Sequence, residues 1–167
     1  MKDVSEFLKM LKKPDFSDFA TVASVFENVS KNKEAREQIK KLFEQELEQE
    51  MQRDAKALFK WSSRSFLRKA FILALHLRLE GLRTTQIRRF LSMVQRARTS
   101  LRQRRGVEPE ILRMRVALAH AAARHKQARP LLAVVDRALP HVTPENFEKF
   151  HDFVQAVVAY HQFLGGE

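Results

Sequence analysis

The chain has 167 residues with four glycines, five prolines and no cysteine, and its formal net charge is +11 at pH 7. The lack of cysteine excludes disulfides, thiol catalysis and thiolate-bound zinc. A chain of this length can bury a core of its own, and so few glycines and prolines favour helices over strands joined by turns. The composition therefore predicts an all-α fold, a compact bundle of about six to eight helices.

Residues 1–60 predict three helices and carry 12 basic and 12 acidic side chains. The helices are expected over residues 1–13, around the apolar residues of 19–29, and over 34–58. The last of them contains an acidic run, EQELEQE at 44–50. Because these carboxylates alternate round a helix instead of converging on one point, we expect a solvated face and no metal site.

A fourth helix is predicted from Ser62 or Ser63 to Glu80, and it is apolar nearly all round. That pattern is typical of a central helix covered by its neighbours. It is too short and too charged to span a membrane, and the N-terminus shows no signal-peptide pattern. The narrow polar strip of this helix holds Lys69 and is flanked by Arg68, so we expect both side chains to face outward.

Residues 82–101 predict a helix with an apolar stripe on one face and arginines on the other. Gly81 should end the preceding helix, and Thr84 or Thr85 is expected to cap the new one. The apolar residues recur at spacings of three and four, which places Arg88, Arg89 and Arg96 on the opposite side.

Near the C-terminal end of this helix, arginines occupy positions on its apolar face. Arg98 and Arg105 return to the side that the apolar residues bury, and a buried guanidinium without a partner is very costly. We therefore expect the helix either to leave the core or to stop near Ala97. Residues 99–107 are then predicted to be an exposed, mobile basic segment.

Three more helices are predicted in the remainder of the chain. One opens at residues 108–110 with a Glu-Pro-Glu start, a short one follows Pro130, and the last opens at Thr143 and Pro144 and ends before two glycines. His161 lies on the apolar face of the last helix and is predicted to be a hydrogen-bonded core histidine.

The first of these three helices carries a basic stripe. Arg113, Ala117, His120 and Arg124 recur at spacings of four, three and four, so they share one face. A small residue between basic ones leaves a surface that a phosphate backbone can approach closely.

Positive charge is concentrated in the middle of the chain. Residues 61–137 carry 18 basic and 4 acidic side chains, and residues 138–167 carry 1 and 4. Such concentration causes self-repulsion that a polyanion would relieve, and arginine pairs with phosphate bidentately. The pattern favours a nucleic-acid partner over a membrane surface or an acidic protein.

No motif of a known catalytic or metal centre occurs. The six histidines form no HExxH pair, and there is no glycine-rich phosphate loop or GxSxG turn. We expect no enzyme activity, no metal and no cofactor. The enzyme alternative is a nuclease in which His120 acts as general base beside Arg124.

Three segments resemble one family in order and spacing: TTQIRRFL at 84–91, MRVALAHAAAR at 114–124 and FEKFHDFVQAVVAYHQFLGG at 147–166. Together they are similar to the small subunit of Csm-type (type III-A) CRISPR effector complexes. The resemblance covers residues 65–167. Residues 1–64 have no such match, and we expect them to be a charge-neutral helical segment within the same domain.

The resemblance implies a non-catalytic subunit of an RNA-guided interference complex in the prokaryotic cytoplasm. Its implied partners are guide RNA, target RNA, the backbone and large subunits, and further copies of itself, stacked head to tail or as a dimer; no membrane is implied. Arg88 and Arg89 match the family's Arg-Lys, and Arg124 matches its terminal arginine. His120 departs from the usual tyrosine.

The predicted RNA contacts are basic side chains that would hold phosphates without reading bases. Two alternatives stay open: a helix-turn-helix-like protein that binds duplex DNA, and a structural helical adaptor. The predicted contacts are Arg68, Lys69, Arg88, Arg89, Arg96, Arg113, His120, Arg124 and Lys126.

Overall fold

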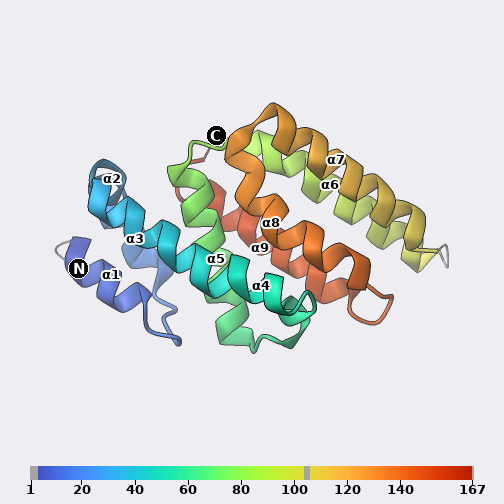
Figure 1. Ribbon diagram of the computed structural model, residues 1–167, viewed down its shortest axis with the longest axis horizontal. Coiled ribbons are helices and arrows are strands. Elements are labelled where there is room, and N and C mark those ends of the chain that lie inside the picture. Colours follow the sequence, from blue (N-terminus) through green and yellow to red (C-terminus); the bar gives the residue numbers. More distant parts are fainter. Residues whose placement is uncertain (1–3, 104–105, 167) are drawn as a thin grey trace.

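In the computed structural model, residues 4–103 and 106–166 are described, and within these ranges the fold is all-α (Figure 1). A π-helical segment, Glu44–Glu48, joins α3 to α4 without a break, so these ranges form eight continuous helices, as predicted. The helices are α1 (Val4–Leu11), α2 (Val22–Lys31), α3 (Lys33–Phe43), α4 (Gln49–Arg53), α5 (Ser63–Leu79), α6 (Thr84–Arg102), α7 (Glu108–Arg124), α8 (Arg129–Ala138) and α9 (Phe147–Phe163).

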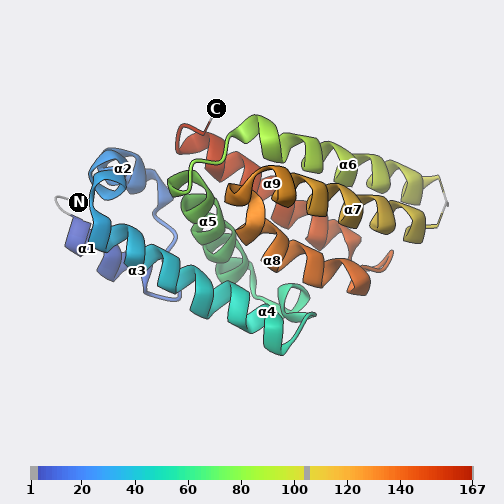
Figure 2. The same cartoon turned by 45° about the horizontal axis from the view of Figure 1, so that its top comes forward.

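Helix α5 lies at the centre of the molecule, between α3 on one side and α9 on the other (Figure 2). Every side chain from Arg68 to Leu77 is buried, which explains why the sequence of this helix is apolar nearly all round. One continuous core extends from Phe7 to Leu164. No helix in the described ranges combines the length and the apolar character needed to cross a membrane.

Helices α6 and α7 run in opposite directions side by side, and α6 rests on α9 while α7 rests on α8 (Figure 2). The predicted apolar stripe of α6 is buried. Of the two alternatives for the end of this helix, the stop near Ala97 is wrong, because α6 continues to Arg102, and residues 98–102 of the continuing helix are not buried. The helix can continue because Arg98 is only half-buried and its Nε donates to Glu148 Oε1 at 2.8 Å. Arg105 lies outside the described residues.

The turn between α5 and α6 forms where it was predicted, but its cap differs. Gly81 has a φ of +90°, a conformation that favours glycine, and it ends α5. The residue that caps α6 is Arg83, not Thr84 or Thr85, and its backbone N–H donates to Gln86 Oε1 at 2.9 Å. Thr84 is buried instead, with its hydroxyl 2.8 Å from His161 Nδ1.

His161 is fully buried at this junction of α6 and α9, so the prediction of a hydrogen-bonded core histidine is confirmed. Burial lowers its pKa to about 4. The imidazole is therefore neutral at pH 7, and it can share one hydrogen bond with Thr84 without a charged partner.

Two predicted helix ends are wrong by several residues. The third helix ends at Arg53 instead of residue 58, and Asp54 then adopts an extended backbone. The last helix begins at Phe147 instead of Pro144, because Thr143 and Asn146 form a turn of their own. In that turn, Thr143 N donates to Asn146 Oδ1 at 2.7 Å, and Asn146 N donates to Thr143 Oγ1 at 3.3 Å.

Candidate nucleic-acid interface

A groove with a volume of about 810 Å³ lies between α6 and α7. We call it the α6–α7 groove; it is lined by side chains of α6 from Thr85 to Arg96 and of α7 from Ala117 to Arg124, with residues 125–131 at one end. Its floor is apolar and includes the buried Phe90 and Leu118. The groove therefore has a rigid base that belongs to the core of the protein.

Basic side chains stand around the mouth of this groove. Arg89 and Arg96 are two turns apart on α6, so they project from the same face, and His120 and Arg124 are one turn apart on α7. All four are exposed. Two antiparallel helices thus present four basic side chains to one open space.

Small residues and one hydrogen bond shape the groove. Ala117 and Ala121 of α7 line it, and their short side chains leave the space open between the two helices. At one end, Gln86 Nε2 lies 3.2 Å from His125 Nδ1, which links the first turn of α6 to the end of α7. The rims of the groove are therefore held at a fixed separation where the helices come together.

The arginines of the groove have no acid beside them among the described residues. No carboxylate lines the groove, and Arg89, Arg96 and Arg124 form no ion pair with any side chain that the structure describes. By contrast, Arg98 and Arg115 outside the groove pair with Glu148 and Asp136 at 2.8 and 2.9 Å. The groove consequently concentrates positive charge that a ligand can neutralise.

Three other predicted contacts are exposed but do not line the groove. Arg88 and Lys126 lie outside it. Arg113 shares a sequence stripe with His120 and Arg124, yet it is beyond the groove and pairs with Glu110 at 2.8 Å. The structure thus brings together Arg89, Arg96, His120 and Arg124 from the predicted set.

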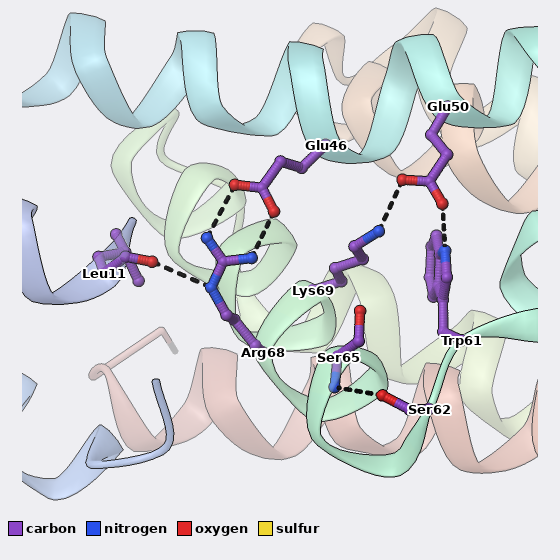
Figure 3. A network of polar contacts seen from close by, with 8 residues as sticks. All are labelled: Leu11, Glu46, Glu50, Trp61, Ser62, Ser65, Arg68 and Lys69. Carbon is purple, nitrogen blue, oxygen red and sulfur yellow. Dashed lines mark hydrogen bonds and ion pairs between the residues drawn. The ribbon is translucent and has the colours of Figure 1, made fainter. Parts of the chain in front are cut away.

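Arg68 and Lys69 require a correction, because both are buried inside the protein (Figure 3). Arg68 is only 2% exposed; its guanidinium holds both oxygens of Glu46, and its Nε donates to the carbonyl of Leu11 at 3.0 Å. Arg68 and Lys69 therefore support the fold, and the prediction that they contact RNA is wrong.

Lys69 is held in a similar way beside this pair. Its Nζ lies 2.6 Å from Glu50 Oε2 and 4.5 Å from the centre of the Trp61 ring. The indole Nε1 of Trp61 donates to the other oxygen of Glu50, also at 2.6 Å. A carboxylate, an ammonium and an indole thus form one closed network (Figure 3).

The acidic run at 44–50 is therefore not simply a solvated face. Glu46 and Glu50 are one turn apart in sequence, and both side chains turn inward toward α5, with 28% and 30% of their surface exposed. The signal for this pairing was present in the sequence. Two acids spaced by four face two adjacent basic residues in an otherwise apolar helix.

One group of potential metal ligands was not singled out from the sequence. Glu148, His151 and Asp152 of α9 place one ligand atom each within 4.8 Å of one another. The Arg98 guanidinium already neutralises Glu148, and His151 Nδ1 lies 3.1 Å from Asp152 Oδ1. A positive charge in direct contact with the group opposes cation binding.

Comparison with known proteins gives one family. The family model described as Csm2 Type III-A matches residues 60–167 of the chain. This match contains all of α5 to α9 and hence both helices of the α6–α7 groove. No curated protein matches the chain.

Proposed function

Because the chain belongs to the Csm2 Type III-A family, the small subunits of type III-A CRISPR complexes, we propose that it binds guide RNA and target RNA in the α6–α7 groove. The contacts are to phosphates, so the subunit holds the RNA without reading its sequence. Recognition of the target then rests on base pairing between guide and target.

The observation that carries this proposal is the set of arginines that lack carboxylate partners. Arg89, Arg96 and Arg124 surround one groove that contains no acid, whereas Arg98, Arg113 and Arg115 outside it are already paired. Guanidinium groups without a protein partner bind phosphate strongly and bidentately. Phe90, the phenyl ring among the groove's lining residues, belongs to the buried floor, which favours backbone contacts over base stacking.

The proposed role is non-catalytic. His120 is the exposed histidine of the groove, and no carboxylate of the groove is available to orient its ring or stabilise its protonated form. A general base of the usual kind would need such a partner. The subunit is thus proposed to position RNA for other subunits of the complex.

The partners of the subunit follow from the same proposal. Leu112 and Val116 are 65% and 58% exposed and lie one turn apart on α7. Exposed apolar side chains of this size are typical of protein contacts. We assign α7 a role in assembly with backbone or large subunits or with further copies of the chain, in the cytoplasm of a prokaryotic cell where guide RNA is found.

The duplex-DNA alternative is less well supported. A recognition helix must protrude far enough to enter a major groove. Helix α6 rests on α9 along one face and lies beside α7 along another. The exposed side chains of α6 include four arginines that suit phosphates, Arg88, Arg89, Arg96 and Arg102.

RNA binding by a double variant tests the proposal. Arg89→Ala/Arg96→Ala should weaken binding of single-stranded or paired RNA about tenfold in a fluorescence-anisotropy titration, with no dependence on sequence. The dependence of log Kd on log salt should fall by about 1.4 for a single strand, since two phosphate contacts are lost. The melting temperature should stay within about 2 °C of wild type, because both side chains are exposed.

A matched control removes the same charge elsewhere. Arg53→Ala/Arg64→Ala changes two exposed arginines outside the groove and should bind RNA like the wild type. Equal weakening in both variants would mean that RNA binding depends on the net charge of the protein and not on the groove. Tighter binding to a specific duplex DNA sequence, or RNA cleavage by the purified chain, would contradict the proposal.

A further inference from the structure

A second hollow in the surface lies where α3 meets the end of α5. It has a volume of about 430 Å³, and we call it the α3–α5 pocket. One wall is formed by residues 31–40 at the end of α2 and the start of α3, and the other by His76, Leu79 and Glu80 at the end of α5. The first wall belongs to the N-terminal part of the chain, which the family match does not include.

Four basic side chains line this pocket against two acids, Glu37 and Glu80. Two of the four already have partners. Arg36 Nη2 donates to the carbonyl of Leu79 at 3.2 Å and thereby satisfies the end of α5, and Lys31 pairs with Glu27 at 3.1 Å.

The other two are Lys33 and Lys40, both exposed. Neither forms a hydrogen bond or an ion pair with a side chain in the described part of the chain. Their ammonium groups remain available to a ligand.

His76 is a buried part of the α5 wall of this pocket. It is 4% exposed, and its ring stacks on Phe43 with 4.8 Å between ring centres. Burial, and then repulsion from Lys40, lower its pKa to about 4, so its imidazole is neutral at pH 7. The neutral ring of His76 and the apolar Leu79 thus face the basic side chains, and Glu80 lies at the edge of this wall.

The α3–α5 pocket and the α6–α7 groove lie on either side of the turn between α5 and α6. The pocket ends at Glu80 and the groove begins at Thr85. Even a fully extended chain of five residues spans at most about 18 Å. The turn after Glu80 contains no acid and exposes Arg83, so one positive side chain lies between the two sites.

We propose that the RNA strand bound in the α6–α7 groove continues over Arg83 and places a further backbone phosphate in the α3–α5 pocket, on Lys33 and Lys40. The inference rests on the proposed function. Phosphate suits the pocket because flexible ammonium groups hold it as point charges. The His76 ring in the pocket wall is buried against Phe43 and is not available to stack a base, and the hollow is small for an element of a protein partner.

Binding of a short and a long RNA distinguishes the α6–α7 groove from the α3–α5 pocket. The probes are oligoribonucleotides of roughly six and roughly twenty nucleotides, at the lower part and beyond the upper end of the usual single-strand site sizes. Lys33→Gln/Lys40→Gln in the full chain should weaken binding of the longer RNA about threefold to tenfold and lower its salt slope by about 0.7, since one phosphate contact is lost. Binding of the shorter RNA, which the groove alone accommodates, should not change.

The matched control is Lys9→Gln/Lys41→Gln, which removes the same charge from exposed positions on α1 and α3 outside the pocket. It should bind both RNAs like the wild type. Equal weakening in the two lysine variants, or an unchanged affinity of the pocket variant for the longer RNA, would overturn the inference. If Arg89→Ala/Arg96→Ala also binds both RNAs normally, the proposed function itself fails, so the two failures are distinguishable.

Discussion

A guanidinium that is 2% exposed needs a carboxylate, and Arg68 has one in Glu46. Removing the acid leaves the charge buried without a partner, which typically costs about 3–5 kcal/mol. We therefore expect Glu46→Ala to lower the free energy of unfolding by about that amount in urea denaturation. The loss is a large fraction of the stability of an ordinary domain.

Two further variants make this prediction specific. Glu27→Ala removes the carboxylate of an exposed Glu–Lys pair, with 80% and 72% of the two side chains accessible, and should cost under about 1 kcal/mol. Replacing both charges by apolar groups, in Glu46→Leu/Arg68→Met, should recover much of the loss. A Glu46→Ala variant as stable as the wild type would mean that Arg68 finds another way to be solvated.

The two kinds of arginine in this chain show what a sequence pattern can and cannot predict. The outward position of Arg88 and Arg89 follows from the periodicity of their own helix, and the structure agrees. The inward position of Arg68 depends on Glu46, which is distant in sequence and reaches it from another helix. Local periodicity shows which side of a helix is polar, but not whether a charged partner covers that side.

At the scale of elements, the contact between Thr84 and His161 joins the first turn of α6 to α9. The pKa of His161 is about 4 in the folded protein, below the ordinary value of 6.5. Above pH 6.5 the ring is neutral in both states, and this contribution to stability is fully present. As the pH falls from 6.5 to about 4, the unfolded state binds the proton first, so stability decreases by at most about 3 kcal/mol.

Urea unfolding at pH 7 and pH 4.5 measures this dependence. His161→Asn removes the titrating group and keeps an amide that can bond to Thr84, so this variant should lose less stability on acidification than the wild type. The comparison isolates one histidine from the carboxylates that also titrate. Equal losses in the two proteins would mean that His161 is protonated in the folded state.

Element types were easier to predict than their ends. The starts of α5 and α7 follow from Ser62 and from Pro109, because a capping hydroxyl and an early proline act through the local backbone. The π-helical segment Glu44–Glu48 was not predicted. Glu46 lies in this segment and pairs with Arg68 of α5, but no motif in residues 44–48 specifies a π-helix in place of an α-helix.

At the scale of the whole molecule, the sequence indicated the excess of positive charge in residues 61–137 but not its location in space. Arg89 and Arg124, 35 positions apart, line the same groove because α6 and α7 pack side by side. The sequence alone did not show that Arg98 and Arg115 have acidic partners whereas Arg89 and Arg124 have none among the described residues. Which arginine has an acid beside it is decided by helix packing.

The whole molecule is also expected to fold as one unit, although the family match begins only at residue 60. Helix α5 is buried on all sides from Arg68 to Leu77, and α3 supplies part of that cover. The acids that neutralise Arg68 and Lys69 come from the N-terminal part as well. A fragment of residues 61–167 would expose apolar surface and leave two buried charges without partners.

We therefore predict a single transition for the full chain in differential scanning calorimetry, with equal calorimetric and van't Hoff enthalpies. The fragment 61–167 should keep helical circular dichroism but lose the cooperative transition and bind a dye for exposed apolar surface. Two separate transitions in the full chain, or a fragment that melts as sharply as the full chain, would instead make the N-terminal helices an independent unit. In that case Glu46→Ala should leave the melting of the remainder unchanged, so the two experiments check each other.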